Sequence, residues 1–269
     1  MTLAELFPDE DYRFQMRFER GEPAEFFGPT AAHAAVVAER RHWLTSAPQT
    51  YAALLPAGEP LLEETTEAAF SWNGFAPLPD CTSPWEKCLA LGEFWEADYL
   101  LLKADAAGEI RLLGGCLCFP SSWRLSEKLG QTIEFIHEPV PALNANIGAA
   151  IHKFLLGLKP GAATLRFNWG LSRSAELNQH PARALPRLDA SVRLDEVWLR
   201  VEEQALVALP KSGGILFGIR LVNHPLAAIR EDQLARAGLR RALETMPEAM
   251  AVYKGIAPAR SRLLELLSD

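Results

Sequence analysis

The stretch VWLRVEEQALVALPKSGGILFGIRLV, residues 197–222, carries the clearest strand signal in the chain. Two apolar runs, 197–209 and 214–222, flank the turn sequence Lys211-Ser212-Gly213-Gly214, and polar and apolar residues alternate near the start of the first run. This pattern predicts two antiparallel strands joined by a tight turn. The segment ATLRFNWGL (163–171) predicts a further strand just before them.

A second group of strands lies upstream. The apolar runs DYLLLKA (98–104) and EIRLLGGCLCFP (109–120) flank the turn sequence DAAGE and predict a β-hairpin. Between the hairpin and the last three strands, the sequence predicts a helix over 127–137 with Ser126 as its N-cap, and a longer helix over 143–158. We therefore expect an α+β fold with a PAS-like antiparallel sheet, built from two strands, helices and three strands. In that fold the helices cover one sheet face and enclose a ligand cavity.

Helical extensions are expected on both sides of this core. Helices are predicted after Thr30, over 61–72 and from Pro84, and a basic helix over 226–245 precedes a short tail helix. The resulting division is an N-terminal helical wrapping region (1–97), a PAS-like core (98–225) and a C-terminal helical extension (226–269), which we expect to form one compact unit.

Composition narrows the class of protein. The 269 residues are 49% hydrophobic and 23% charged, as in a soluble globular protein, and the net charge of −7 argues against nucleic acid as a partner. No run of 18 apolar residues and no signal peptide is visible, so no membrane is expected. Four cysteines in a chain of this length predict a cytoplasmic protein with reduced thiols. Cys116 and Cys118 share one strand face, where core packing is the simplest interpretation.

Standard catalytic motifs are absent, but His137 stands apart among the six histidines. It ends a predicted helix and is followed by Glu138-Pro139-Val140-Pro141, which restricts its motion. An imidazole held in one orientation suits a metal or haem ligand. The alternatives are a histidine that interacts with its own helix dipole, and His152 as the ligand instead.

The strands carry rows of polar residues. Alternation places Arg166 and Asn168 on one strand face, and Arg200, Glu202 and Gln204 likewise share a face. That face is either exposed to solvent or directed into a cavity. In a cavity, a carboxylate beside an arginine binds a cation or relays a proton. Further basic residues, Arg124, Lys128 and Arg220, either reach ligand carboxylates such as propionates or are solvated charges.

These motifs together resemble a known family. CFPSSWRLSEKLGQTIEFIHEPVP (118–141) looks like the signature of the DUF3445 family, typified by the haem-dependent oxidative N-demethylase alpha subunit. The later segments RFNW, LRVEEQALVALPKSGGILFGIR and AVYKG (251–255) follow in the family's order. The resemblance covers about residues 10–265.

The resemblance implies a PAS-like domain that binds haem b and has become an enzyme. The family's characterised activity is NADPH- and O2-dependent removal of a methyl group from a small secondary amine, dimethylamine. The carbon leaves as formaldehyde or passes to tetrahydrofolate, which would involve a tetrahydrofolate-binding subunit. FMN and a 2Fe–2S cluster belong to partner chains, so a separate reductase subunit supplies the electrons.

The resemblance also implies roles for individual residues. His137 is the expected iron ligand, and Arg166, Glu202 and Gln204 are the expected catalytic residues on the open face of the haem. There Arg166 is expected to polarise bound O2, and Glu202 to hold the amine. The other expected cofactor-binding residues are Trp123, Arg124, Lys128, Val140, Asn168 and Arg220. One position departs from the family, because Glu203 stands where an arginine is usual. Alternation directs Glu203 away from Glu202, so the change affects either a partner-docking surface or an anchor behind the site.

Two other classes of function stay open at this point. A haem-binding PAS-type gas or ligand sensor would keep the pocket without turnover. A haem-free PAS-like assembly subunit would lack the cofactor altogether.

Overall fold

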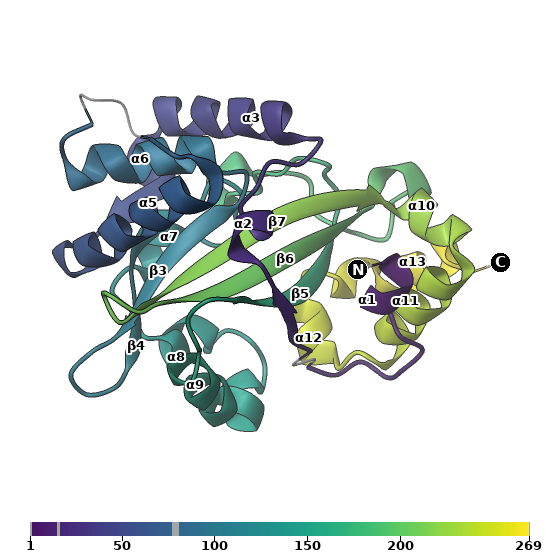
Figure 1. The fold of residues 1–269 in the computed structure, drawn as a ribbon. Helices are drawn as coiled ribbons and strands as arrows, with labels where there is room; N and C mark the ends of the chain where they lie inside the picture. Colours follow the sequence, from purple (N-terminus) through teal and green to yellow (C-terminus); the bar gives the residue numbers. More distant parts are fainter. Residues whose placement is uncertain (1, 15–16, 77–80, 269) are drawn as a thin grey trace.

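A computed structural model describes residues 2–14, 17–76 and 81–268, and places them around one antiparallel sheet (Figure 1). The strands of this sheet run in the order β1-β5-β6-β7-β3-β4-β2. Their bounds are β1 Glu19–Gly21, β2 Ala52–Leu54, β3 Asp98–Ala104, β4 Ile110–Cys116, β5 Ala163–Ser172, β6 Trp198–Leu209 and β7 Gly214–Pro225.

The predicted strands all form, and the α+β class with its antiparallel sheet is confirmed. β6 and β7 pair along their full length, from Trp198 opposite Pro225 to Leu209 opposite Gly214. Gly213 supports the turn between them with a φ of 70°, which a residue without a Cβ adopts readily. The short edge strands β1 and β2 were not predicted, because three residues carry too little alternation to be recognised.

One face of the sheet is covered by helices that precede it in the chain (Figure 1). The bounds of these helices are α2 Pro23–Phe26, α3 His33–Ser46, α4 Pro48–Tyr51, η1 Pro56–Gly58, α5 Glu59–Asn73 and α6 Pro84–Phe94. The contact is close at Gly218 of β7, where a Cβ would lie 2.6 Å from the rings of Phe26 and Phe27. Two of these helices, α5 and α6, are the ones predicted over 61–72 and from Pro84.

Thr30 is not the N-cap of α3, contrary to the prediction. The helix begins at His33 with Ala32 at the N-cap. The Thr30 hydroxyl instead donates to the Glu96 carboxylate at 2.8 Å, and the Thr30 backbone N–H donates to the same carboxylate. A long-range contact that a sequence pattern does not show has thus replaced the local cap.

The other face of the sheet carries shorter helices (Figure 1). These are α8 Ile133–His137, the π-helix η2 Asn144–Gly148 and α9 Ala149–Leu156. The short helix α7 Leu125–Lys128 precedes them and lies next to α4 and the edge strand β2. The single helix predicted over 127–137 is wrong, and so is its cap, because Ser126 lies inside α7. Gly130, with a φ of 77°, breaks the helix and donates its N–H to the carbonyl of Leu112 in β4. Thr132 then caps α8 by accepting the N–H of Phe135.

The C-terminal residues form a bundle beside the ends of β5, β6 and β7 (Figure 1). Its members are α10 Leu226–Glu231, α11 Gln233–Thr245, α12 Glu248–Tyr253, η5 Ala257–Ala259 and α13 Arg260–Leu266. The helix predicted over 226–245 is divided at Asp232, whose carboxylate caps α11. The N-terminal helix α1 (Leu3–Leu6) packs on this bundle through Phe7, whose carbonyl lies against Gly238.

Two short 3-10 helices, η3 Pro181–Arg183 and η4 Leu194–Glu196, complete the described elements. No helix in the described part of the chain is both long and apolar enough to cross a membrane.

A buried ion pair joins α3 to the sheet. Arg40 Nη1 lies 2.6 Å from Asp98 Oδ1, and neither residue is exposed to solvent. The Asp98 carboxylate also accepts the backbone N–H groups of Cys118 and Phe119, at 2.6 and 3.0 Å. Arg40 in turn donates to the carbonyl of Gly92 and to Cys116 Sγ. The pair thereby fixes the segment that follows β4, and Cys116 and Cys118 are buried core residues.

Removing one member of this pair is expected to be costly. Asp98→Asn leaves the buried guanidinium of Arg40 without a counter-ion, which typically lowers the free energy of unfolding by about 3–5 kcal/mol. Urea unfolding at pH 7 measures this loss. The control is Asp195→Asn, which breaks an exposed pair with Arg193 and should change stability by less than about 1 kcal/mol. A similar, small loss in both variants would contradict the prediction.

Candidate functional site

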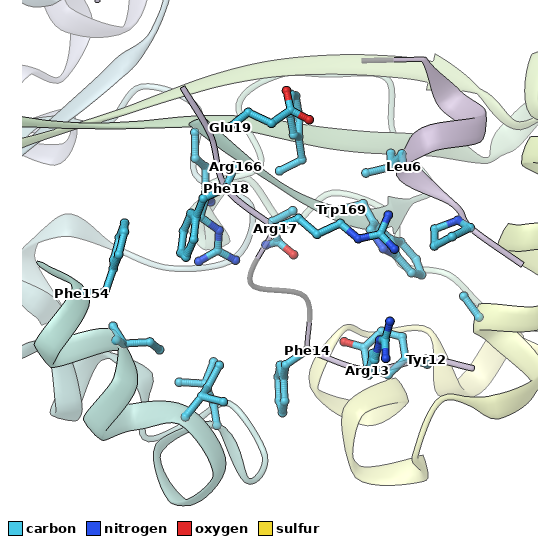
Figure 2. Close-up of a pocket in the computed structure, with 18 of the residues that line it drawn as sticks. Leu6, Tyr12, Arg13, Phe14, Arg17, Phe18, Glu19, Phe154, Arg166 and Trp169 are labelled. Carbon is cyan, nitrogen blue, oxygen red and sulfur yellow. The ribbon is translucent and has the colours of Figure 1, made fainter. Parts of the chain in front are cut away.

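A cavity of about 340 Å³ lies between the sheet, helices α8 and α9, and the N-terminal segment (Figure 2). From the sheet, its wall includes Arg166 and Asn168 of β5 and Gln204 of β6. On the helical side, Phe154 of α9 stacks on Phe18, with ring centroids 4.2 Å apart. The polar row predicted on the strands therefore faces a cavity and not open solvent.

A second cavity of about 360 Å³ adjoins the first between α8, α9 and the β3–β4 hairpin. His137 lines both cavities, together with Ile133, Ile151 and Leu155. The imidazole therefore lies at the boundary of two hollows with largely apolar surroundings.

His137 is available as a ligand. Its ring makes no hydrogen bond to any described residue. Burial, reinforced by the positive charges of Lys128 and Arg166, lowers the pKa of His137 to about 4. The imidazole is thus neutral at pH 7, which is the form that binds iron. The alternative, His152 of α9, lies 2.9 Å from the Gly108 carbonyl through Nε2 and is already engaged.

The Glu202 carboxylate organises the polar row. It accepts hydrogen bonds from Asn168 Nδ2 at 3.1 Å, Gln204 Nε2 at 2.9 Å and Ser121 Oγ at 2.8 Å. An ionised carboxylate only accepts, so both amides must turn their NH2 groups toward it. Their carbonyl oxygens accept no hydrogen bond from any described residue and are free for a ligand. Asn168 and Gln204 line the cavity, whereas Glu202 lies behind them.

Ser121 was missed by the sequence analysis, although it lies within the signature segment. Arg200 holds it in place by donating from Nε to Ser121 Oγ at 3.0 Å. The same guanidinium donates to the carbonyls of Phe119 and Leu177, at 2.8 and 2.7 Å. Burial lowers the pKa of Arg200 to about 10, so it stays positively charged at neutral pH. Arg200 is therefore a positioning residue for the row.

Lys254, from the C-terminal AVYKG segment, was also missed. It follows α12 and lines the cavity, where Nζ donates to the carbonyl of Trp169 at 2.5 Å and lies 5.0 Å from the centre of that ring. The pKa of Lys254 is lowered to about 8, mainly by burial. The charge of Glu202 opposes this shift and the charge of Arg166 adds to it. A lysine in an otherwise apolar segment was the sequence signal for this residue.

Some predicted site residues lie elsewhere. Arg220 is on the opposite face of the sheet, where it pairs with Glu203 at 3.7 Å and donates to the carbonyls of Phe26 and Gly28. Arg124 pairs with Glu127 at the surface. Neither lines either cavity, because strand register and helix position override the sequence pattern.

The remaining predicted residues surround the site without lining the cavities. Lys128 Nζ lies 4.6 Å from the centre of the Trp123 ring, and burial lowers the pKa of Lys128. Val140 packs against the core of the C-terminal bundle. Glu203, the residue that departs from the family pattern, lies behind the site with Arg220.

The sequence matches the family described as haem-dependent oxidative N-demethylase, alpha subunit-like, over residues 31–264. The chain belongs to this family. The family resemblance found in the sequence is thus confirmed, and the site described above belongs to a member of a haem-dependent oxidative N-demethylase family. The alpha-subunit-like description also implies other subunits.

The residues present fit a haem. A neutral, unpartnered imidazole at His137 suits an axial ligand, and Ile133 and Ile151 provide apolar contact for a macrocycle. Lys128 supplies a cation near His137 that suits a propionate.

The buried amine of Lys254 should make stability depend on pH in a defined window. Its pKa is about 8 in the folded chain and near 10.5 when unfolded. Between pH values of about 8 and 10.5, Lys254 carries a proton in the unfolded chain but not in the folded chain. The free energy of unfolding should therefore rise with pH across this window, by up to about 3 kcal/mol.

Urea unfolding of Lys254→Met at pH 7.5, 9 and 10.5 tests this, because the variant should lose that rise. Lys211→Met removes an exposed lysine whose pKa Glu67 raises, and it should keep the rise. Parallel profiles for wild type and Lys254→Met would refute the assignment.

Proposed function

We propose that this chain is the haem-binding subunit of a cytoplasmic oxidative N-demethylase that acts on a small secondary amine with O2. The observation that carries the proposal is the neutral, unpartnered imidazole of His137, which faces the polar row across the cavity. Electrons come from a separate reductase subunit with flavin mononucleotide and a 2Fe–2S cluster, which draws on NADPH. The released carbon leaves as formaldehyde or is taken up by a tetrahydrofolate-binding subunit.

His137 would hold haem b through its iron, with Lys128 near the propionates and Trp123 stacked on Lys128. Bound haem supplies O2 activation and the oxidation of the N-methyl carbon. The chain's own residues bind and orient the amine and limit access of water. Phe18 and Phe154, stacked at 4.2 Å, form an apolar part of the cavity wall that serves the last purpose.

The amine would be held by the carbonyl oxygens of Asn168 and Gln204. Glu202 orients both amides and places a negative charge directly behind them, which favours a substrate that carries N–H donors and a positive charge. The sequence analysis assigned the amine contact to Glu202 itself, and we now infer that Glu202 acts through the two amides. Arg166 offers N–H donors to an oxygen atom of a ligand in the same cavity.

The absorption spectrum of the haem-loaded chain tests the proposal, in the ferric and the reduced state, with and without dimethylamine. We expect a Soret band that shifts when amine is added. His137→Ala should lose or change that band, while His152→Ala should keep it. A band indifferent to amines, without amine-dependent O2 consumption, would favour a sensor, and no band at all would favour a haem-free assembly subunit.

Glu202→Gln should weaken amine binding without loss of haem. The substitution removes the charge behind the amides and places an NH2 group where both amides donate. A charge-assisted hydrogen bond is worth about 1.5–3 kcal/mol, so KM for the amine should rise at least about tenfold. The matched control is Glu203→Gln, which changes the neighbouring residue on the opposite face. Equal KM values for the two variants would contradict the role of Glu202.

A further inference from the structure

Arg166 is a partly buried cation that has no partner among the described residues. Its side chain extends from β5 into the cavity beside Phe18 (Figure 2). The guanidinium makes no hydrogen bond and no ion pair with any described residue, and Nε is sealed from solvent. A buried charge left unpaired is strongly unfavourable, so a ligand is expected to complete this site.

No described carboxylate makes a hydrogen bond or an ion pair with Arg166. Glu19 of β1 lines the same cavity, but it is exposed and does not pair with Arg166. Glu202 is the carboxylate whose charge acts on it, but Ser121, Asn168 and Gln204 already donate to that group. Glu10, elsewhere on the cavity wall, pairs with Arg13 and Arg17. Arg166 is therefore available to an anionic group of a bound molecule.

A second cation increases the need for an anion. Lys254 lines the same cavity, its Nζ donates to a neutral carbonyl, and its charge and that of Arg166 act on each other. Two positive side chains thus lie near Glu202, whose carboxylate is occupied by two amides and a hydroxyl, and the acidic residues of the cavity wall belong to the N-terminal segment. A simple dialkylammonium ion would add a further positive charge and leave Arg166 unpaired.

Acceptors for an ammonium group lie next to this cation. Arg166 is directly opposite Gln204 in the register of β5 and β6, and Asn168 is two residues along the same strand. Residues two apart on one strand face are separated by about 6–7 Å. A cation that recognises a carboxylate and two carbonyls that recognise N–H groups are therefore within the span of one small zwitterion.

We propose that Arg166, supported by Lys254, binds the carboxylate of the substrate, and that the substrate is an N-methylated α-amino acid. This rests on the proposed N-demethylase function and narrows its substrate class. The carboxylate takes two of the five guanidinium N–H donors, and the amine donates to Asn168 and Gln204. The carboxylate of the zwitterion pairs with Arg166 while its amine donates to the two carbonyls, whereas dimethylamine can make only the second contact.

Calorimetric titration of the haem-loaded chain tests this with three ligands: N-methylglycine, N-methylglycinamide and dimethylamine. The amide keeps the amine but lacks the carboxylate charge. Wild type should bind N-methylglycine at least tenfold more tightly than either other ligand. Arg166→Gln should abolish that preference, and Arg166→Lys should retain part of it. Arg13→Gln removes an arginine of the same cavity that is already paired with Glu10, and it should leave the preference unchanged.

Two results would overturn the proposal. Equal binding of all three ligands to wild type would mean that no carboxylate is recognised. Loss of haem from Arg166→Gln with the ligand preference intact would assign the guanidinium to a haem propionate instead. Failure of the proposed function is seen separately, as absence of a Soret band. A tenfold preference for N-methylglycine over its amide in that haem-free protein would still support the carboxylate subsite.

Discussion

The carboxylate of Asp98 is the interaction on which the arrangement of the site depends. It stands at the start of β3, pairs with Arg40 of α3, and accepts the backbone N–H groups of Cys118 and Phe119. A buried carboxylate with three donors is well satisfied, and it fixes each donor in return. The chain after β4 is therefore held against the sheet at the point where it leads to Ser121.

From there, a continuous polar network reaches the cavity. Phe119 offers its carbonyl to Arg200, Arg200 holds Ser121, and Ser121 donates to Glu202. Glu202 then sets the orientation of Asn168 and Gln204. Every group of this network except the two amides uses its hydrogen bonds within the protein. The free carbonyls at the end are thus preorganised by residues that never touch a ligand.

The sequence predicted those parts of the structure that depend on local periodicity. Period-two alternation gave the strands and placed Asn168, Glu202 and Gln204 on one face, and the proline pair correctly marked the end of α8 at His137. Prediction from the sequence failed where a contact between residues far apart in the chain determines the structure. Gly130 interrupts the expected helix because its N–H reaches β4, and Arg220 faces away from the cavity because β7 pairs it with Glu203. Lys254 enters the site from a helix bundle whose docking no local pattern encodes.

The charged side chains on the two faces of the sheet around β6 differ in whether they are paired within the protein. On the face toward α2, Glu203 and Arg220 neutralise each other, and Arg220 also binds carbonyls of the N-terminal region. On the other face, Glu202 is saturated by neutral donors and Arg166 is left alone. The charge of Glu202 acts on Arg166, but the hydrogen bonds of that carboxylate go to the two amides and to Ser121. Because an unpaired cation inside a cavity lowers stability, the position of Arg166 beside free carbonyl acceptors supports a ligand that carries both an anion and an N–H group.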